Sequence, residues 1–168
     1  MTISMYSASV PIFERMLSSL LSCLDKAERH ARAREFDPDN YVGLRLAPDM
    51  LSFSKQIQIA CDAAKGCVCR LGGQEIPKWA DDEATLEALQ TRLRRTLELV
   101  RSVSASQIDG SEEREVVITL RNRDPLRFSG EDYLRHWALP NFFFHVTTAY
   151  ALLRQAGVPL GKADYLGG

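Results

Sequence analysis

The side chains best suited to chemistry are one histidine and the polar residues that helical spacing could bring to it. His145 follows three consecutive phenylalanines, and Asn141 lies four residues before it, so both share one face of a helix. Gln58 and Asp62 have the same spacing in an earlier segment. If the two segments pack together, Gln58, Asp62, Asn141 and His145 line one polar cleft in an apolar wall. The chemistry expected of such a cleft is the binding of a small ligand.

A metal site is the first alternative to test against these residues. A transition-metal ion generally needs three or more ligands from histidine, carboxylate or thiolate side chains. Only His145 and Asp62 qualify, because Asn141 and Gln58 offer amides. The pattern therefore predicts a buried histidine hydrogen-bonded to an amide or a carboxylate, with no firmly bound metal and no cofactor. A divalent ion held weakly by His145 and Asp62 is the alternative.

Other catalytic patterns are missing from the chain. It contains no G-x-S-x-G motif, and the pair Gly72-Gly73 stops a helix instead of forming a phosphate-binding loop. The four cysteines include no C-x-x-C pair, so we expect buried thiols in a reducing cytoplasm. They are Cys23, Cys61, Cys67 and Cys69.

The charge of the chain disfavours two classes of partner. With 21 basic and 22 acidic residues, the net charge is −1, which leaves no field to attract nucleic acid or anionic lipid. Arg92, Arg94 and Arg95 cluster, but glutamates flank them on the same predicted helix, which favours a solvated face over a phosphate groove. No apolar run approaches the roughly 20 residues of a membrane span, and the start lacks a secretory signal. We therefore expect a cytoplasmic protein without a nucleic-acid or membrane partner.

Four amphipathic helices in a single domain, residues 1–168, are the elements that must position these side chains. A chain of 168 residues with 45% hydrophobic residues can bury a sizeable core. Its apolar residues recur at three- and four-residue steps, as in helices with one buried face. The predicted helices span about residues 5–33, 48–71, 82–103 and 140–156.

Local signals set the expected ends of these helices. Pro48 and Pro140 suit the first helical turn, where the missing N–H is not needed. Asp81 or Asp82 suits the cap of the third helix. Gly157 suits the left-handed position just after the last helix.

The hydrophobic period changes between the third and fourth helices. Residues 115–120 and 125–128 alternate as strands do, around a turn at 121–124, which predicts a short β-hairpin over residues 115–128. Two strands alone are marginally stable, so the hairpin must pack on the helices or on a partner. Ser129 begins a capping-box pattern that opens a short helix before Pro140. The expected fold is all-α, a four-helix bundle with one small hairpin.

Six segments of the sequence carry a resemblance to a known family. They are residues 45–50 (RLAPDM), 56–62 (QIQIACD) with 64–65 (AK), 70–72 (RLG), 139–145 (LPNFFFH), 149–157 (AYALLRQAG) and 158–167 (VPLGKADYLG). The segments span nearly the whole chain, and the last two are the most specific. With them the chain resembles the DinB/YfiT-like superfamily of four-helix bundles. It most resembles the branch, found in bacteria and fungi, whose domain has no assigned function.

The resemblance implies a degenerate metal site. Metal-binding members of the superfamily use one histidine from the second helix and two histidines four residues apart in the last helix. His145 matches the last of these, Asn141 stands at the position of its partner, and Gln58 falls about where the second-helix histidine is expected. Two of the three ligands are therefore replaced.

Three functions follow as expectations. The first is a DinB-like protein that binds a small ligand, or has a stress-associated accessory role, in a cleft with Gln58, Asn141 and His145. The second is an enzyme of the thiol S-transferase type, in which a divalent ion on His145 and Asp62 lowers the pKa of a thiol or water. The third is a structural dimer or interaction module. The frequent dimers of the superfamily imply a homodimer, and the sequence leaves open whether the protein is an enzyme.

Overall fold

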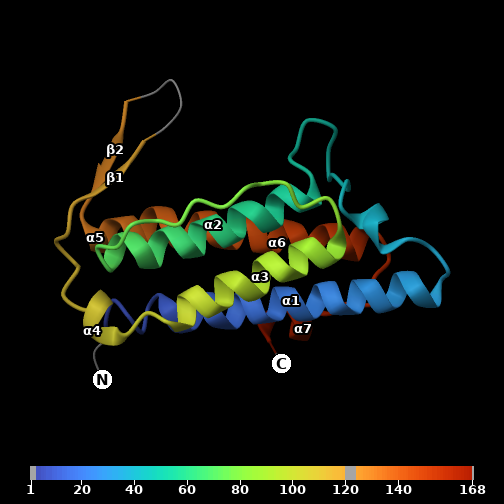
Figure 1. The fold of residues 1–168 in the computed structure, drawn as a ribbon, viewed down its shortest axis with the longest axis horizontal. Helices are drawn as coiled ribbons and strands as arrows, with labels where there is room; N and C mark the ends of the chain where they lie inside the picture. Colours follow the sequence, from blue (N-terminus) through green and yellow to red (C-terminus); the bar gives the residue numbers. More distant parts are fainter. Residues whose placement is uncertain (1–2, 120–123, 168) are drawn as a thin grey trace.

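Four long helices form the body of the protein in a computed structural model, which describes residues 3–119 and 124–167 (Figure 1). They are α1 (Val10–Ala33), α2 (Phe53–Leu71), α3 (Leu86–Arg101) and α6 (Leu139–Gln155). The shorter elements are η1 (Pro38–Tyr41), α4 (Ala105–Ile108), β1 (Val116–Ile118), β2 (Leu126–Phe128), α5 (Gly130–Asp132), η2 (Tyr133–Ala138) and α7 (Lys162–Leu166). The expected fold class, an all-α bundle with a small β-hairpin before the last long helix, is confirmed.

The apolar faces of the long helices meet in one core. α2 packs against α3 and α6, while α1 packs against α3, α6 and α7. Phe13 of α1 and Phe142 of α6 are fully buried and meet edge to face, with ring centroids 4.9 Å apart. Burying a side chain of this size contributes about 1.5–3 kcal/mol. The core therefore fixes how α2 and α6, which carry the predicted site residues, face each other.

Three of the four long helices begin later than the sequence pattern predicts. α1 begins at Val10 instead of residue 5, with Pro11 in its first turn. α2 begins at Phe53, so Pro48 lies in the preceding turn and not at the helix start. α3 begins at Leu86 because Thr85 caps it, its Oγ1 accepting from the Ala88 amide at 3.1 Å.

Asp81 and Asp82, the predicted caps of α3, lie in the loop before it instead. The carboxylate of Asp81 pairs with Arg92 in α3 and with Lys55 in α2, so it cannot serve the helix end. The Leu86 amide receives a second cap from outside the helix, since Asp39 Oδ1 accepts from it at 2.7 Å. Ion pairs to the body of the bundle thus override the local capping signal.

The sequence predicts that the last helix starts anew at Pro140, but the structure shows no such restart. The chain is helical without a break from Gly130 to Gln155, and the segment before the proline, η2, has wide π-type turns. In a regular α-helix, the proline ring would clash with the carbonyl four residues earlier. The wider turns of η2 lie directly before Pro140. Because π-type turns bond residues five apart, they change the position of the carbonyl four residues before the proline. Two predictions at the ends are confirmed, since Ser129 Oγ accepts from the Asp132 amide and Gly157 has a φ of +89°.

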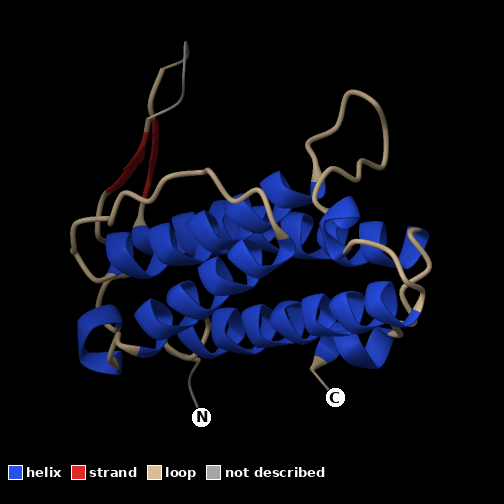
Figure 2. Ribbon diagram, turned by 45° about the vertical axis from the view of Figure 1, so that its right-hand side comes forward, coloured by secondary structure: helices blue, strands red, loops and turns tan. Residues whose placement is uncertain are grey.

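The β-hairpin projects from one end of the bundle. β1 and β2 are antiparallel, with Val116 opposite Phe128 and Ile118 opposite Leu126. The predicted turn at 121–124 lies largely outside the described residues. Phe128 packs on Tyr133 and Trp137, with ring centroids 6.2 Å and 5.9 Å away. Residues 42–52 project from the same side of the bundle at its other end (Figure 2).

The end of the chain folds back onto the bundle as α7. Its Asp164 forms an ion pair with Lys26 of α1, and Arg15 Nε donates to the Leu166 carbonyl at 2.8 Å. Across the described parts of the chain, we find no helix with the length and apolar character needed to cross a bilayer.

Candidate functional site

His145 is buried in α6 and is hydrogen-bonded to an amide, but the amide is Gln56 and not Gln58. Its Nδ1 lies 2.7 Å from Gln56 Oε1, and Gln56 Nε2 donates to the Leu51 carbonyl at 3.1 Å. Burial lowers the pKa of His145 below its usual value. The contact joins the first turns of α2 to α6.

Gln58 points away from His145. Side chains two positions apart in sequence point about 200° apart around a helix. The rotation of α2 that turns Gln56 toward α6 therefore turns Gln58 toward the connection to α3. Gln58 is buried, and its Nε2 donates to Glu83 Oε2 at 2.7 Å. We call this connection, residues 72–85, the α2–α3 loop.

Arg92 is the centre of a buried ionic network that fastens the α2–α3 loop. Its Nη2 lies 3.0 Å from both Asp62 Oδ1 and Asp81 Oδ1, and its Nη1 lies 2.8 Å from Glu83 Oε1. Although burial alone would raise the pKa of Glu83, hydrogen bonds from Arg92 and Gln58 bring it below its usual value. Only 3% of Arg92 is exposed, so the prediction of a solvated face is wrong for this residue.

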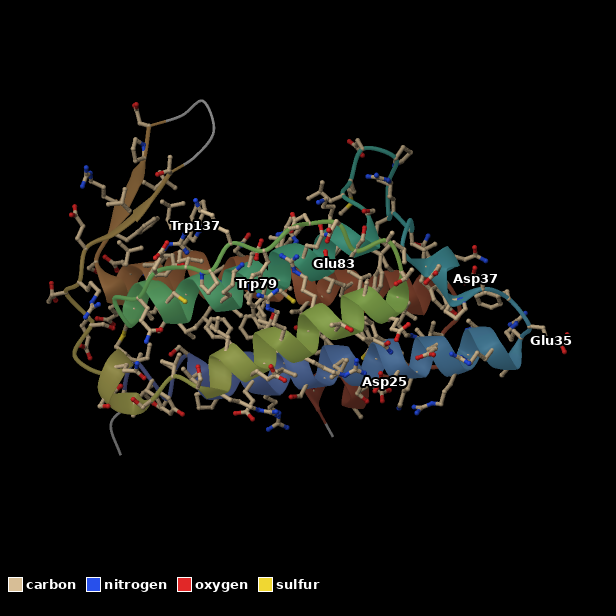
Figure 3. The ribbon with its side chains drawn as sticks, viewed as in Figure 1. Asp25, Glu35, Asp37, Trp79, Glu83 and Trp137 are labelled. Atoms are coloured by element: carbon tan, nitrogen blue, oxygen red, sulfur yellow. The ribbon has the colours of Figure 1, made fainter. Side chains whose placement is uncertain are left out.

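Trp79 lies in the same loop, over the place where α2 and α3 pass each other (Figure 3). Three cations lie over its ring: the Lys65 Nζ of α2 and the Arg95 guanidinium of α3 are each 4.2 Å from the ring centroid, and the Arg92 guanidinium is 5.9 Å away. Cations at these distances are attracted by the ring face. The loop is therefore held to both helices by charge and by aromatic contact.

Asp62 and Asn141, two of the predicted cleft residues, line one cavity. It has a volume of about 180 Å³ and lies between α2, the hairpin and the helix that runs from α5 to α6. We call it the α2–α6 cavity. Its remaining lining consists of Ile59, Ala63, Arg70, Ile118, Tyr133, Trp137 and Ala138. His145 and Gln58 are not among these lining residues, so the four predicted residues occupy three environments.

Arg70 is a cavity residue that no sequence pattern indicated. Its Nη1 donates to the Tyr133 hydroxyl at 3.1 Å, and its guanidinium lies 5.7 Å from the centroid of that ring. Burial raises the pKa of Tyr133 well above its usual value, so the phenol stays neutral. Within residues 3–119 and 124–167, no carboxylate lies within ion-pair distance of Arg70. The signal that could have found it was a glycine, Gly66, one helical turn earlier in a helix interior.

The groups that could hold a metal ion are dispersed. Among the residues that the structure describes, no three His, Cys, Asp or Glu side chains are grouped as metal ligands. Asp62 Oδ1 instead lies 2.7 Å from Lys65 Nζ in addition to its contact with Arg92.

All four cysteines are free and buried, as the sequence suggested. Burial raises the pKa of Cys61 to about 12 and that of Cys23 to about 11. Thiols with such pKa values are neutral near pH 7 and are poor nucleophiles.

Comparisons with known proteins agree with the fold. The family described as "Domain of unknown function (DUF1993)" matches residues 5–166. A solved structure, of a DinB family member protein from Shewanella denitrificans, is similar with 37% sequence identity and a TM-score of 0.88. The similarity covers 97% of this chain and 92% of that chain. No curated protein matches. The resemblance to DinB-like bundles that the six sequence segments indicated is confirmed.

Proposed function

Since the chain belongs to the family of the domain of unknown function DUF1993, with a DinB-like fold, we propose that it binds a small ligand in the α2–α6 cavity. The observation that carries the proposal is that Asp62 and Asn141 line this cavity together with Arg70. Polar groups from α2 and α6 thus converge on one space. Ligand sites typically combine a few such polar groups with an apolar wall.

The cavity suits a ligand of few atoms. Its volume of about 180 Å³ is below the roughly 300–1,000 Å³ of sites for drug-sized molecules. Trp137 and Tyr133 supply flat aromatic surface, while Ile59, Ala63 and Ala138 supply aliphatic surface. Asp62 and Asn141 supply oxygen and nitrogen atoms that could fix the orientation of a bound molecule.

We assign supporting roles to Gln58 and His145. Gln58 donates to Glu83, which holds the α2–α3 loop beside Asp62 through Arg92. His145 bonds to Gln56 and so sets the position of Asn141, one turn earlier on α6. The proposal includes no firmly bound metal or cofactor, which the pairing of Asp62 with two cations supports. Binding without turnover would suit an accessory role, including a stress-associated one.

The alternative of a metal-dependent thiol S-transferase requires Asp62 and His145 to share an ion. Asp62 lines the α2–α6 cavity, whereas His145 is engaged with Gln56. The geometry therefore favours ligand binding over this enzyme. A cytoplasmic location is part of the proposal and is supported by the four free thiols.

A homodimer is also part of the proposal. Phe144 directly precedes His145, and Leu51 supplies the carbonyl that accepts from Gln56; the two residues are 57% and 47% exposed. Large exposed apolar side chains often mark contact surfaces. Solution mass measured by light scattering for the natural chain and for Phe144→Ser tests this part, and a monomeric natural chain at micromolar concentration would exclude it.

The ligand site is tested by blocking the cavity. A library of small molecules is screened by NMR against the natural chain and two variants. Ala63→Leu places a larger side chain in the cavity, and Ala33→Leu, at the exposed end of α1, is the control. We expect molecules that bind the natural chain to shift its Trp137 indole signal. The same molecules should bind Ala33→Leu but not Ala63→Leu. Molecules that bind Ala63→Leu as well as the natural chain would contradict the proposal.

A further inference from the structure

The charges around the α2–α6 cavity identify the class of ligand. We infer that the cavity takes a small organic carboxylate, anchored by the guanidinium of Arg70. This inference rests on the proposed function, because it concerns the same cavity. It adds the chemistry of the ligand and a positioning role for Gly66.

The first step is the balance of charge. Asp62 lines the cavity, but its carboxylate is neutralised by Lys65 at 2.7 Å and by Arg92 at 3.0 Å. Arg70 lines the same cavity, and among the described residues only a neutral phenol, Tyr133, accepts a hydrogen bond from its guanidinium. The unmatched charge of the cavity is therefore positive.

An adjacent groove has the same sign of charge. It shares Asp62 and Arg70 with the cavity and is also lined by Lys65 and Lys78. Three basic side chains thus surround one acidic side chain that is already paired. An anion that enters from this side is attracted toward Arg70.

The second step is the position of the guanidinium. A Cβ atom added to Gly66 would lie 2.5 Å from Arg70 Nη1, so the guanidinium rests against helix backbone that carries no side chain. The same nitrogen donates to the Tyr133 hydroxyl at 3.1 Å. Glycine in a helix interior costs about 1 kcal/mol relative to alanine. A helix that retains it here leaves room for a fixed cation.

The third step is the fit of a carboxylate. A guanidinium presents parallel N–H donors that match the two oxygens of a carboxylate. The Asn141 amide lines the same cavity and can donate to a second atom of the ligand. Trp137 and Tyr133 offer their rings to the body of the molecule. A small carboxylate with a flat apolar body satisfies all of these groups.

Benzoate and its neutral analogue benzamide are the probes that test the inference. They have nearly the same shape and differ in charge, so calorimetric titration of the natural chain should show at least about tenfold tighter binding of benzoate. In Arg70→Met the preference should disappear, because benzoate loses affinity and benzamide does not.

Gly66→Ala provides the more discriminating variant. The added methyl group must displace the end of the Arg70 side chain, which is flexible, so the fold should persist and the melting temperature should stay equal or rise. Benzoate affinity should nevertheless fall about tenfold. Gly43→Ala is the matched control, since a Cβ there meets nothing within 4 Å, and it should bind benzoate as the natural chain does.

The outcomes separate this inference from the proposed function. Equal binding of benzamide and benzoate, or full benzoate affinity in Gly66→Ala, would overturn the carboxylate assignment while leaving a ligand cavity. Displacement of benzoate by an equal concentration of inorganic phosphate would also overturn it, because the site would then respond to charge alone. Failure of benzoate to bind the natural chain would overturn the inference alone, whereas benzoate binding unaffected by Ala63→Leu would overturn the inference and count against the proposed function as well.

Discussion

The imidazole of His145 is held in one tautomer by Gln56. The Gln56 Nε2 atom donates to the Leu51 carbonyl, so the atom that faces the ring, 2.7 Å from Nδ1, is the oxygen Oε1. An amide oxygen can only accept, and Nδ1 therefore carries the proton. The lone pair of the neutral ring then lies on Nε2. A backbone carbonyl in the segment before α2 thus determines the protonation pattern of a side chain in α6.

Stability should fall in mildly acidic solution because of His145. Burial lowers its pKa in the folded state below the usual 6.5. The unfolded chain then binds the proton more readily, so the stability is complete above about pH 6.5 and is lost as the pH falls through the interval below that value. The slope for one such group is at most about 1.4 kcal/mol per pH unit.

Urea unfolding between pH 7.5 and pH 5 measures this effect. His145→Gln should show a flatter dependence of the unfolding free energy on pH. His136→Gln is the control, since the His136 side chain is 62% exposed, and it should follow the natural chain. Parallel curves for His145→Gln and the natural chain would contradict the assignment.

Removal of Arg92 should destabilise the protein strongly. Arg92→Met leaves Glu83, of which only 12% of the side chain is exposed, without its cation. Breaking a buried ion pair costs about 3–5 kcal/mol, and we expect the lower end because Asp62 and Asp81 are each 43% exposed. Arg94→Met, on the exposed face of the same helix, should change the unfolding free energy by about 0.5 kcal/mol or less. Equal losses in the two variants would show that the network around Arg92 contributes little.

The cysteines should resist modification in the folded protein. Burial raises the pKa of Cys61 to about 12 and that of Cys23 to about 11, and Cys67 and Cys69 are also buried. We expect a disulfide reagent such as DTNB at pH 8 to label the thiols only as fast as the protein unfolds, and to label all four in denaturant. Rapid labelling of one thiol under native conditions would contradict the expected burial.

Ligand binding should not depend on a metal ion. If the cavity binds benzoate through Arg70 and Asn141, the affinity should be the same in EDTA and in added zinc, because neither side chain requires an ion. His145→Gln should keep the preference for benzoate over benzamide, because Arg70 sets that preference and His145 acts only on the position of Asn141. A stability gain in zinc that disappears in His145→Gln would instead support the weak metal site on His145 and Asp62.

The period of apolar residues predicts the long helices and the hairpin because burial of one face is what creates that period. The helix starts are less predictable, since they depend on distant partners. Asp81 has the residue type and position of a cap, but Arg92 and Lys55 bind its carboxylate. Pro140 has the type of a helix start, but the wide turns of η2 allow it inside a helix.

The sequence predicts which segments carry the site residues, but it does not predict which of their side chains contact each other. The four-residue spacing of Gln58 and Asp62 is correct for one face of α2, but the rotation of that helix brings Gln56 to His145. Such a rotation is set by packing across the whole bundle. The sequence predicts a solvated Arg92, and this is wrong because acidic residues outside α3 neutralise it. They come from the α2–α3 loop and from α2, which no pattern along α3 can reveal.

The wide turns of η2 have a consequence for how insertions and deletions can accumulate in this chain. Tyr133, Trp137 and Asn141 reach the same cavity across a stretch whose angular step differs from that of an ordinary α-helix. A π-type stretch advances about 80° per residue and an α-helix about 100°, so loss of one residue combined with tightening into a regular α-helix would leave the direction of Tyr133 relative to α6 nearly unchanged. The cost of the tightening would fall on Pro140, whose ring would then meet the carbonyl four residues earlier, so the length of this stretch is constrained by the proline more than by the cavity.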